Sequence, residues 1–203
     1  MNEVEATYGQ TDSGMTVIEG NLFLNGNKPI DQRSSYGLGE VLKAALDNQA
    51  EHIVMSLGGI GSFDAGAGML QALGAKFYDD EANIVDVSDG ADKIKYIRRI
   101  DLSNVHPRLA DAKLQLMSDF SSRLYGKQSE IMQTYQTFHL NQNEAAEIDN
   151  LVWYFSELFK SELKLAIGPI ERGGAGGGIA AVLKGLYQAE ILTSHELVNQ
   201  ITH

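Results

Sequence analysis

Hydrophobic and polar positions alternate along the chain in patterns typical of both strands and helices. Apolar residues recur at helical spacing over residues 36–48, with Ser35 placed as the cap of that helix. The continuous apolar run 52–57 has the length of a strand and leads directly into a glycine-rich turn. Before these elements, two short apolar runs flank a turn-rich loop and predict a β-hairpin, at residues 4–8 and 15–19.

The same reasoning predicts further elements after the turn. Small residues together with Met69 and Leu70 predict a tightly packed helix over residues 64–73. A long apolar stripe predicts a helix from about residue 142 to 163, with Asn141 and Glu144 placed as a capping box. The remaining predicted elements are strands at 75–78 and 113–117 and helices at 179–187 and 195–201. Helices that alternate with strands in this way indicate a layered α/β domain.

Acidic residues outnumber basic ones, 27 against 16, which gives a formal net charge of -11. Such a field repels phosphate backbones and anionic lipid, so we expect no binding to nucleic acid or to a membrane surface. No run approaches the roughly 20 apolar residues that a spanning helix requires. The acidic start at Glu3 and Glu5 differs from the basic start of a signal peptide, and we therefore expect a cytoplasmic location.

The residues that commonly bind metals do not form a metal motif in this sequence. The chain contains no cysteine, which excludes a disulfide scaffold, a thiol nucleophile and cysteine-ligated metals. The segment that begins at His195 and Glu196 misses the HExxH zinc motif at its last position. Asp86, Asp89 and Asp92 lack the spacing of a calcium loop, which favours a solvated acidic turn. No metal site is predicted.

Two glycine-rich segments carry the most distinctive pattern. The first, residues 58–68, joins a predicted strand to the next helix, and the second, residues 168–178, holds six glycines. Glycines let the backbone approach a ligand closely, and free N–H groups at a helix start favour an anion. The first segment completes neither a Walker A loop nor a GxGxxG motif. Each segment therefore has two interpretations, a ligand-binding turn and a tight turn that permits close packing.

Three blocks of sequence stand out together. They are Ser35-Tyr36-Gly37-Leu38-Gly39-Glu40, the turn with Asp64 followed by Gly66-Ala67-Gly68-Met69-Leu70-Gln71-Ala72-Leu73-Gly74-Ala75, and Ala175-Gly176-Gly177. Together they resemble the bacterial glycerate kinase family, over nearly the whole chain but only the middle of such a kinase. Family members carry an amino-terminal Asp-Ser-Phe-Lys segment and a carboxy-terminal Gly-Glu-Gly-Arg segment, which pair into a second, Rossmann-like lobe. Neither segment occurs in this sequence.

The resemblance implies a fold and a reaction. The implied fold is the central α/β domain of a glycerate kinase, a mixed sheet covered by helices, and we expect it to occupy residues 1–203 as one domain. The family reaction transfers the γ-phosphoryl group of ATP to a hydroxyl of glycerate with Mg²⁺, in a cleft between two lobes. For this chain alone, without the Rossmann-like lobe, we expect no cofactor.

The resemblance also implies roles for individual residues. Asp64 would be the catalytic base or the carboxylate that orients the attacking hydroxyl. Asp119 would support the ligand or a metal. The residues that would face substrate or phosphate are Gly58, Gly59, Ser62 and Gly66. An aspartate at position 64 is equally suited to cap the following helix, and this alternative stays open.

The chain departs from the family pattern where chemistry is expected. The family's Gly-Gly-Ser-Ala-Thr-Asn-Asp-Gly-Gly reads here with Ile60 in place of a serine and Phe63 in place of the asparagine. Its Cys-Asp-Val-x-Asn-Pro-Leu keeps Asp119 but loses the asparagine and the proline, and residues 134–139 replace its Phe-Gly-Pro-Gln-Lys-Gly. These changes remove polar partners for a ligand. The alternative function is therefore that of a degenerate, non-catalytic homologue that binds a small carboxylate or a partner.

Three expectations follow from these interpretations. We expect the chain to fold alone and cooperatively, because it has its own helix–strand–helix core. We expect no ATP-dependent phosphorylation of glycerate by the chain alone, because transition-state stabilisation needs both walls of the cleft. Apart from glycerate, the expected partner is either a second copy of the chain in a homodimer or the missing kinase lobe.

Overall fold

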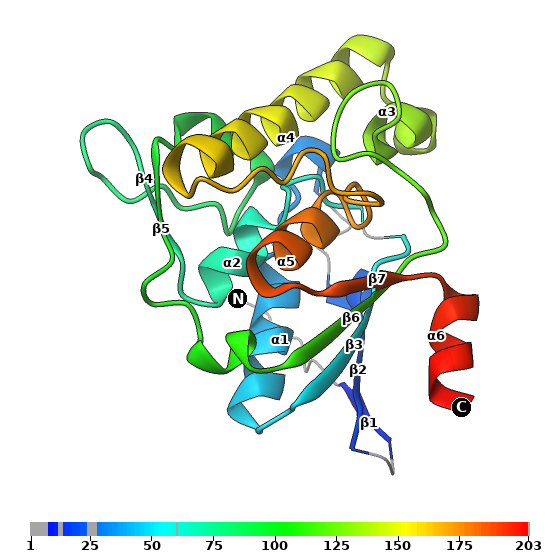
Figure 1. Cartoon of the computed structure of the whole chain (residues 1–203). Helices are drawn as coiled ribbons and strands as arrows, with labels where there is room; N and C mark the ends of the chain where they lie inside the picture. Colours follow the sequence, from blue (N-terminus) through cyan, green and yellow to red (C-terminus); the bar gives the residue numbers. More distant parts are fainter. Residues whose placement is uncertain (1–7, 12–13, 24–27, 60, 203) are drawn as a thin grey trace.

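The computed structural model describes residues 8–11, 14–23, 28–59 and 61–202 (Figure 1). Its main sheet has five strands in the order β1-β2-β3-β6-β7. The strands β2, β3, β6 and β7 run parallel, and β1 pairs antiparallel with β2, so the expected mixed sheet is confirmed. Their bounds are β1 Gly9–Gln10, β2 Thr16–Glu19, β3 His52–Ser56, β6 Lys113–Met117 and β7 Glu190–Leu192.

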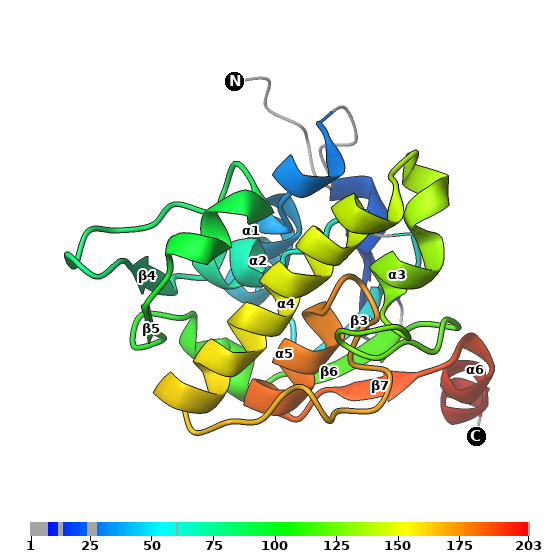
Figure 2. The same ribbon diagram turned by 90° about the horizontal axis from the view of Figure 1, so that it is seen from above.

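Helices cover one face of this sheet in two layers (Figures 1 and 2). The inner layer contains α1 (Tyr36–Asp47), α2 (Ala67–Ala72) and α5 (Ile179–Tyr187). The long helix α4 (Gln142–Glu162) crosses over α2 and α5 as the outer layer, and the short helix α3 (Glu130–Thr134) precedes it.

The helix α6 (Ser194–Thr202) lies on the opposite face of the sheet. Leu114 and Leu116 of β6 point into the core beneath the inner helices, so Gln115 between them points to the other face. The Gln115 side-chain amide donates a hydrogen bond to the Gln200 side-chain oxygen at 2.7 Å, and this contact places α6 there.

Two apolar clusters hold the layers together. The cluster between sheet and inner helices includes Ile53 and Met55 of β3, both at most 1% exposed. The cluster beneath α4 is aromatic: Phe155 packs edge-on against Phe77 and Phe159, with ring centroids 5.8 Å and 5.1 Å away. Edge-to-face pairs of this kind add to the stabilisation that burial provides.

The sequence pattern predicted α4 well. The helix begins at Gln142, and the predicted capping box is present, because the Asn141 side chain accepts from the Glu144 amide while the Glu144 side chain accepts from the Asn141 amide. Its predicted stripe is buried from Ile148 to Phe159. Trp153, on the flank of the stripe, remains 46% exposed.

Several predicted elements differ from the observed ones. Helix α2 begins at Ala67 rather than at residue 64, because Ala65 and Gly66 adopt left-handed backbone angles, φ of 50° and 75°. The predicted strand 75–78 is β4 (Lys76–Tyr78), but it pairs antiparallel with β5 (Arg99–Asp101) in a separate sheet. The hairpin uses Gly9 and Gln10 as its first strand, and residues 4–7 lie outside the described residues.

Strand β7 and helix α3 were not predicted from the pattern. Short 3-10 helices complete the structure at Gly20–Phe23, Ile30–Gln32, Ala91–Tyr96, Pro107–Ala110 and Tyr135–Phe138. Within the described ranges, no helix combines the length and the hydropathy needed to cross a membrane.

Candidate functional site

The carboxyl ends of the parallel strands meet at one edge of the sheet, and two of the segments predicted to carry chemistry begin there. The glycine-rich turn follows β3 and Asp119 follows β6, while Ser194, for which no role is predicted, follows β7. The Ser118 amide donates to the Leu192 carbonyl at 2.8 Å, which holds the exits of β6 and β7 together. In open α/β sheets, ligands bind outside this edge.

Asp64 lies at the end of the first glycine-rich turn and is completely buried, with 0% exposure. Its Oδ2 accepts from the Ser35 amide at 2.7 Å, the Ser35 hydroxyl at 2.8 Å, the Gly68 amide at 3.1 Å and the Ser34 hydroxyl at 3.4 Å. Its Oδ1 accepts from the Gly66 amide at 3.0 Å. The carboxylate is therefore saturated by donors from its own chain.

These contacts tie the start of α1 to the start of α2. Ser35 precedes α1, yet its hydroxyl makes no capping bond in that helix and instead accepts from the Met69 amide of α2 at 2.9 Å. A side chain at Gly68 would collide with the Ser34 hydroxyl, so the close approach requires glycine. Asp64 accepts from the amides of Gly66 and Gly68 at the start of α2, although Gly66 itself occupies the N-cap position.

The other residues predicted around this turn divide into two groups. Gly58 and Gly59 are exposed, whereas Ser62 and Gly66 are buried, and Ile60 lies outside the described residues. The Ser62 hydroxyl has no hydrogen-bond partner in the described part of the chain. Phe63, one of the departures from the family pattern, is 2% exposed and packs edge-on against Phe138 at 5.7 Å.

Asp119 bonds to a different element from Asp64. Its exposed carboxylate accepts from the Ser194 amide at 2.8 Å and from the Ser194 hydroxyl at 2.9 Å, at the start of α6. These two bonds hold the pKa of Asp119 below its usual range. In this structure Asp119 thus caps α6.

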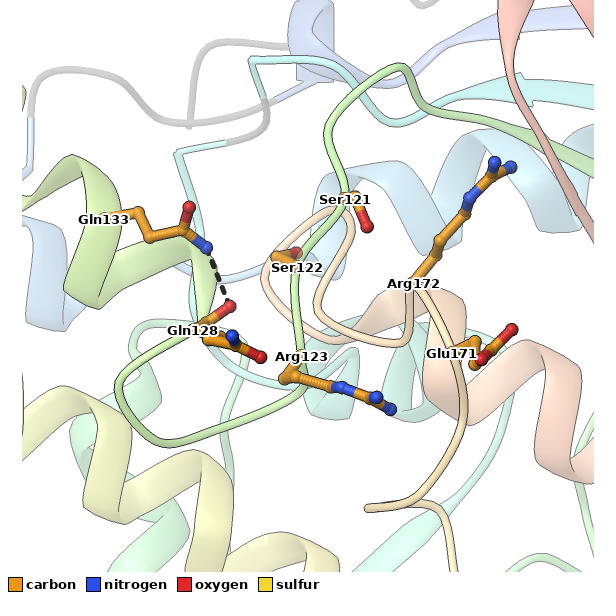
Figure 3. Close-up of a pocket in the computed structure, with 7 residues that line it drawn as sticks. All are labelled: Ser121, Ser122, Arg123, Gln128, Gln133, Glu171 and Arg172. Carbon is orange, nitrogen blue, oxygen red and sulfur yellow. Dashed lines mark hydrogen bonds between the residues drawn. The ribbon is translucent and has the colours of Figure 1, made fainter.

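A pocket of about 370 Å³ lies beside the segment that follows β6 (Figure 3). One wall comes from the segment that runs from β6 to α3, and the other comes from the start of the second glycine-rich segment. The lining residues are Ser121, Ser122, Arg123, Gln128, Gln133, Glu171 and Arg172. Ser122 is 3% exposed, and its hydroxyl has no hydrogen-bond partner among the residues that the structure describes.

The charged residues that line the pocket are Arg123, Arg172 and Glu171 (Figure 3), so the arginines outnumber the carboxylate there. The Arg123 side chain is exposed, and its guanidinium has no ion-pair partner within the described ranges. Arg172 pairs with Glu196 at 2.9 Å, and the contacts of Glu196 with Thr193 and Arg172 lower the pKa of Glu196 to about 2. Arg172 adopts a left-handed φ of 55°, a strained conformation that concentrates at functional sites.

The glycines of the second segment allow close packing against both the pocket and the turn after β3. A side chain at Gly174 would collide with the Arg123 carbonyl and the Ser122 hydroxyl, and one at Gly177 would collide with the Ser62 carbonyl. The Gly177 amide donates to the Glu130 carboxyl at 3.3 Å. Burial raises the pKa of Glu130 to about 7, against the opposing effect of the Gly177 and Gly176 amides.

Sequence reasoning missed the residues that line this pocket. Arg123 stands where the family block has its proline, and Arg172 directly precedes the glycines, but neither pattern predicts a chemical role. Guanidinium, hydroxyl and amide groups around a small cavity suit a carboxylate or a phosphate group. The arrangement can therefore bind a small anionic molecule.

Comparisons of the sequence with known proteins identify a family to which the chain is similar. Residues 1–203 match the glycerate kinase family. The chain is 32% identical to a glycerate kinase of Halalkalibacterium halodurans, over 98% of this chain and 54% of that protein. It is 29% identical to the glycerate 2-kinase of Escherichia coli K12, over 97% of this chain and 53% of that protein. The chain thus spans about half the length of these relatives.

A solved structure shares the architecture. A crystal structure described as that of glycerate kinase 2 from Salmonella typhimurium LT2 superposes with a TM-score of 0.86 at 26% identity. The match covers 96% of this chain and 54% of that chain. The family resemblance and the α/β fold inferred from the sequence are confirmed.

Proposed function

The chain belongs to the glycerate kinase family, and from this premise we propose that it forms the part of a glycerate kinase that binds glycerate. The observation that carries the proposal is the pocket beside β6. There the Arg123 guanidinium and the buried Ser122 hydroxyl both lack a partner in the described part of the chain. Leaving the buried Ser122 hydroxyl without a partner costs free energy, and a ligand that supplies the missing hydrogen bond explains its presence, while the exposed Arg123 guanidinium is open to an anion.

Glycerate carries a carboxylate and hydroxyl groups, and the pocket offers a match for each. The planar guanidinium of Arg123 suits a carboxylate through two parallel hydrogen bonds. Ser121 and Ser122 can each donate to and accept from a hydroxyl group. The cavity, about 370 Å³, lies at the small end of ligand pockets, which suits a molecule of this size.

In the complete kinase, we propose that ATP phosphorylates glycerate bound in this pocket. Phosphoryl transfer depends mainly on positioning and on charge stabilisation. This chain would supply the positioning: Arg123 fixes the carboxylate end of glycerate, so that a hydroxyl at the other end stays free for the phosphoryl donor. We assign the contacts with the nucleotide to the half of the relatives that this chain does not span.

ATP and Mg²⁺ are the cofactors proposed for the complete enzyme. Within the described ranges, no group of three or more His, Cys, Asp or Glu side chains is placed to hold a metal ion. The pocket offers mainly hydrogen-bond donors, whereas Mg²⁺ prefers carboxylate and phosphate oxygens. These residues do not fit the metal, and no residue of this chain is assigned to it.

For Asp64 we propose a positioning role. Its predicted function, to orient the attacking hydroxyl, stays a prediction, because in this structure the carboxylate is buried and bonded to five donors. Its contacts fix α1, α2 and the turn after β3 relative to one another. The predicted ligand contacts of Asp119, Gly58, Gly59, Ser62 and Gly66 also stay predictions.

A second function is favoured by one observation. Because the donors around Asp64 already satisfy its carboxylate, the described residues of the turn after β3 include no free buried carboxylate that could act as a base. This favours a homologue that binds a small carboxylate without catalysing phosphoryl transfer. Binding of glycerate is common to both functions, and turnover separates them.

Binding is tested by titrating the isotope-labelled chain with D-glycerate and following backbone amide signals by NMR. We expect the signals of Ser121, Ser122 and Arg123 to shift. Glycerol is the matched control, because it keeps the hydroxyls but lacks the carboxylate, and we expect it to cause no shift. Shifts confined to other parts of the chain, or equal shifts with glycerol, would contradict the proposal.

Turnover is tested by a coupled assay of ADP release with D- and L-glycerate. We expect none from the chain alone, and we expect it from a polypeptide that joins the chain to the remaining half of a glycerate kinase. Binding without turnover in the joined polypeptide would favour the second function.

A further inference from the structure

The carboxyl of Glu130 connects the two walls of the pocket. Glu130 is the first residue of α3, and its Oε2 accepts from the Gly177 amide at 3.3 Å. The neighbouring Gly176 amide also acts to lower the pKa of this carboxyl. Gln128 and Gln133, on either side of Glu130 in the chain, line one wall. The segment that leads into these glycines supplies Glu171 and Arg172 to the other wall.

The charged residues on the elements around Glu130, including Glu171 on the facing segment, do not contribute to its pKa. Arg123 lines the pocket, and Arg172 pairs with Glu196. On α4, the Asp149 carboxylate accepts from the Gly126 amide at 2.8 Å. The pKa of Glu130 is set by its burial, which raises it to about 7, and by the amides of Gly176 and Gly177, with no charged side chain contributing. Its partners in the described residues are therefore backbone amides.

We propose that Glu130 is a positioning residue that latches α3 to the glycine-rich loop, and that the latch loosens when its carboxyl loses its proton. The latch itself rests on the contacts of Glu130. Its consequence for glycerate rests on the proposed function, because the latch sets the spacing of the two walls that would hold the ligand.

The direction of the effect follows from the burial of the carboxyl. Folding removes this group from water, and the charged form loses more hydration than the neutral form. The protonated carboxyl still accepts an amide hydrogen bond through its carbonyl oxygen. The latched arrangement is therefore fully favoured below the ordinary pKa of 4.5, and it is lost as the pH rises through about 7.

The latch is tested by recording the NMR signals of the Gly176 and Gly177 amides of the whole chain from about pH 5 to about pH 9. We expect both signals to move together with a midpoint near 7. The variant Glu130→Gln keeps an oxygen that can accept the amides but cannot titrate, and its signals should stay constant. The variant Glu51→Gln, which removes an exposed carboxyl just before β3, should titrate like the wild type.

Signals of Gly176 and Gly177 that do not titrate in the wild type would overturn the proposal, whether or not the variant folds. So would an unchanged titration in Glu130→Gln, since another group would then be responsible. A merely structural role for Glu130 predicts lower stability in the variant but no titration at the two glycines.

The consequence for the ligand is tested by measuring the Kd for D-glycerate across the same pH range. We expect the wild-type affinity to fall severalfold as the pH rises through neutrality, and the affinity of Glu130→Gln to be independent of pH. The same pH dependence in both proteins would overturn the link between latch and pocket. Absence of glycerate binding at every pH would contradict the proposed function, while the glycine signals would still decide on the latch.

Discussion

The two glycine-rich segments differ in how completely the charged groups beside them are satisfied, although a buried serine hydroxyl without a partner in the described residues lies at each, Ser62 at the first and Ser122 at the second. At the turn after β3, the buried carboxylate of Asp64 accepts five hydrogen bonds. Beside the loop before α5, the buried hydroxyl of Ser122 and the guanidinium of Arg123 have no partners in the described part of the chain. A satisfied network makes a rigid junction, whereas unpaired groups around a cavity retain the capacity to bind.

Two carboxyl groups, the buried Asp64 and the half-buried Glu130, extend this contrast. Asp64 accepts from hydroxyls and amides at the starts of two helices, so its charge is well compensated. The carboxyl of the half-buried Glu130 accepts from the Gly177 amide, the Gly176 amide also acts on it, and burial nevertheless raises its pKa to about 7. Proximity to glycine-rich backbone does not by itself mark a ligand site. The number of hydrogen-bond donors that the chain supplies to each carboxyl group distinguishes a structural junction, such as that at Asp64, from a group that can still change its protonation, such as Glu130.

The largest effect is expected for Asp64→Ala. The substitution leaves several buried donors without an acceptor, and it should lower the free energy of unfolding by about 3 kcal/mol. Chemical denaturation measures this loss, with the exposed Asp80→Ala as the control. Asp64→Asn should be destabilised as well, because its amide faces donors. A stabilised Asn variant would contradict the comparison, since it would show that the carboxylate is kept for a ligand.

A smaller, pH-dependent effect is expected for Glu130→Gln. Because the pKa of Glu130 is raised from 4.5 to about 7, the charged form opposes folding above neutral pH. The variant should be more stable than the wild type by roughly 1 to 3 kcal/mol near pH 8, and should differ little near pH 4. Denaturation midpoints at both pH values provide the test. A stability difference that is independent of pH would show that Glu130 is not a buried titrating group.

The substitution Ser122→Ala should leave stability unchanged or raise it by up to about 1 kcal/mol, because it removes a buried hydroxyl that has no partner. Its matched counterpart is Ser35→Ala, which removes a hydroxyl bonded to both Asp64 and Met69 and should cost about 1 to 2 kcal/mol. Thermal unfolding of the two variants gives the comparison. Equal losses would mean that Ser122 is satisfied in solution.

The smallest effect is expected for Asp119→Ala. Its carboxylate is exposed and bonds to Ser194, so the change should loosen the first turn of α6 and leave the global unfolding midpoint almost unchanged. Amide hydrogen exchange in α6 measures this loosening. If the same variant also bound glycerate more weakly, the predicted ligand contact of Asp119 would be supported.

Local patterns predicted the elements whose residues determine their own structure. The stripe and capping box of α4 and the apolar run of β3 are examples. The start of α2 was misplaced because the left-handed backbone at Ala65 and Gly66 depends on the tertiary contacts of Asp64. The local pattern predicted strand β4 but not the separate sheet to which it belongs, because the pairing of β4 with β5 depends on residues that are not adjacent in the sequence.

The candidate site was predictable only in part. The family blocks led to the turn around Asp64, whereas the pocket is formed by residues 121–133 and 171–172, which are far apart in the sequence. Nothing in the local pattern distinguishes Arg123, which has no ion-pair partner among the described residues, from Arg172, which is paired with Glu196. Charge pairing and cavity shape emerge only when the chain folds.

Binding of glycerate in this pocket is tested most directly by the affinity of Arg123→Met for D-glycerate, measured by calorimetry at neutral pH. We expect the affinity to fall about tenfold or more, because a charged hydrogen-bond partner of the carboxylate is removed. Arg99→Met, which removes the same charge from β5 in the second sheet, should bind like the wild type. Unchanged affinity in Arg123→Met, or an equal loss in Arg99→Met, would contradict the assignment of this pocket to glycerate.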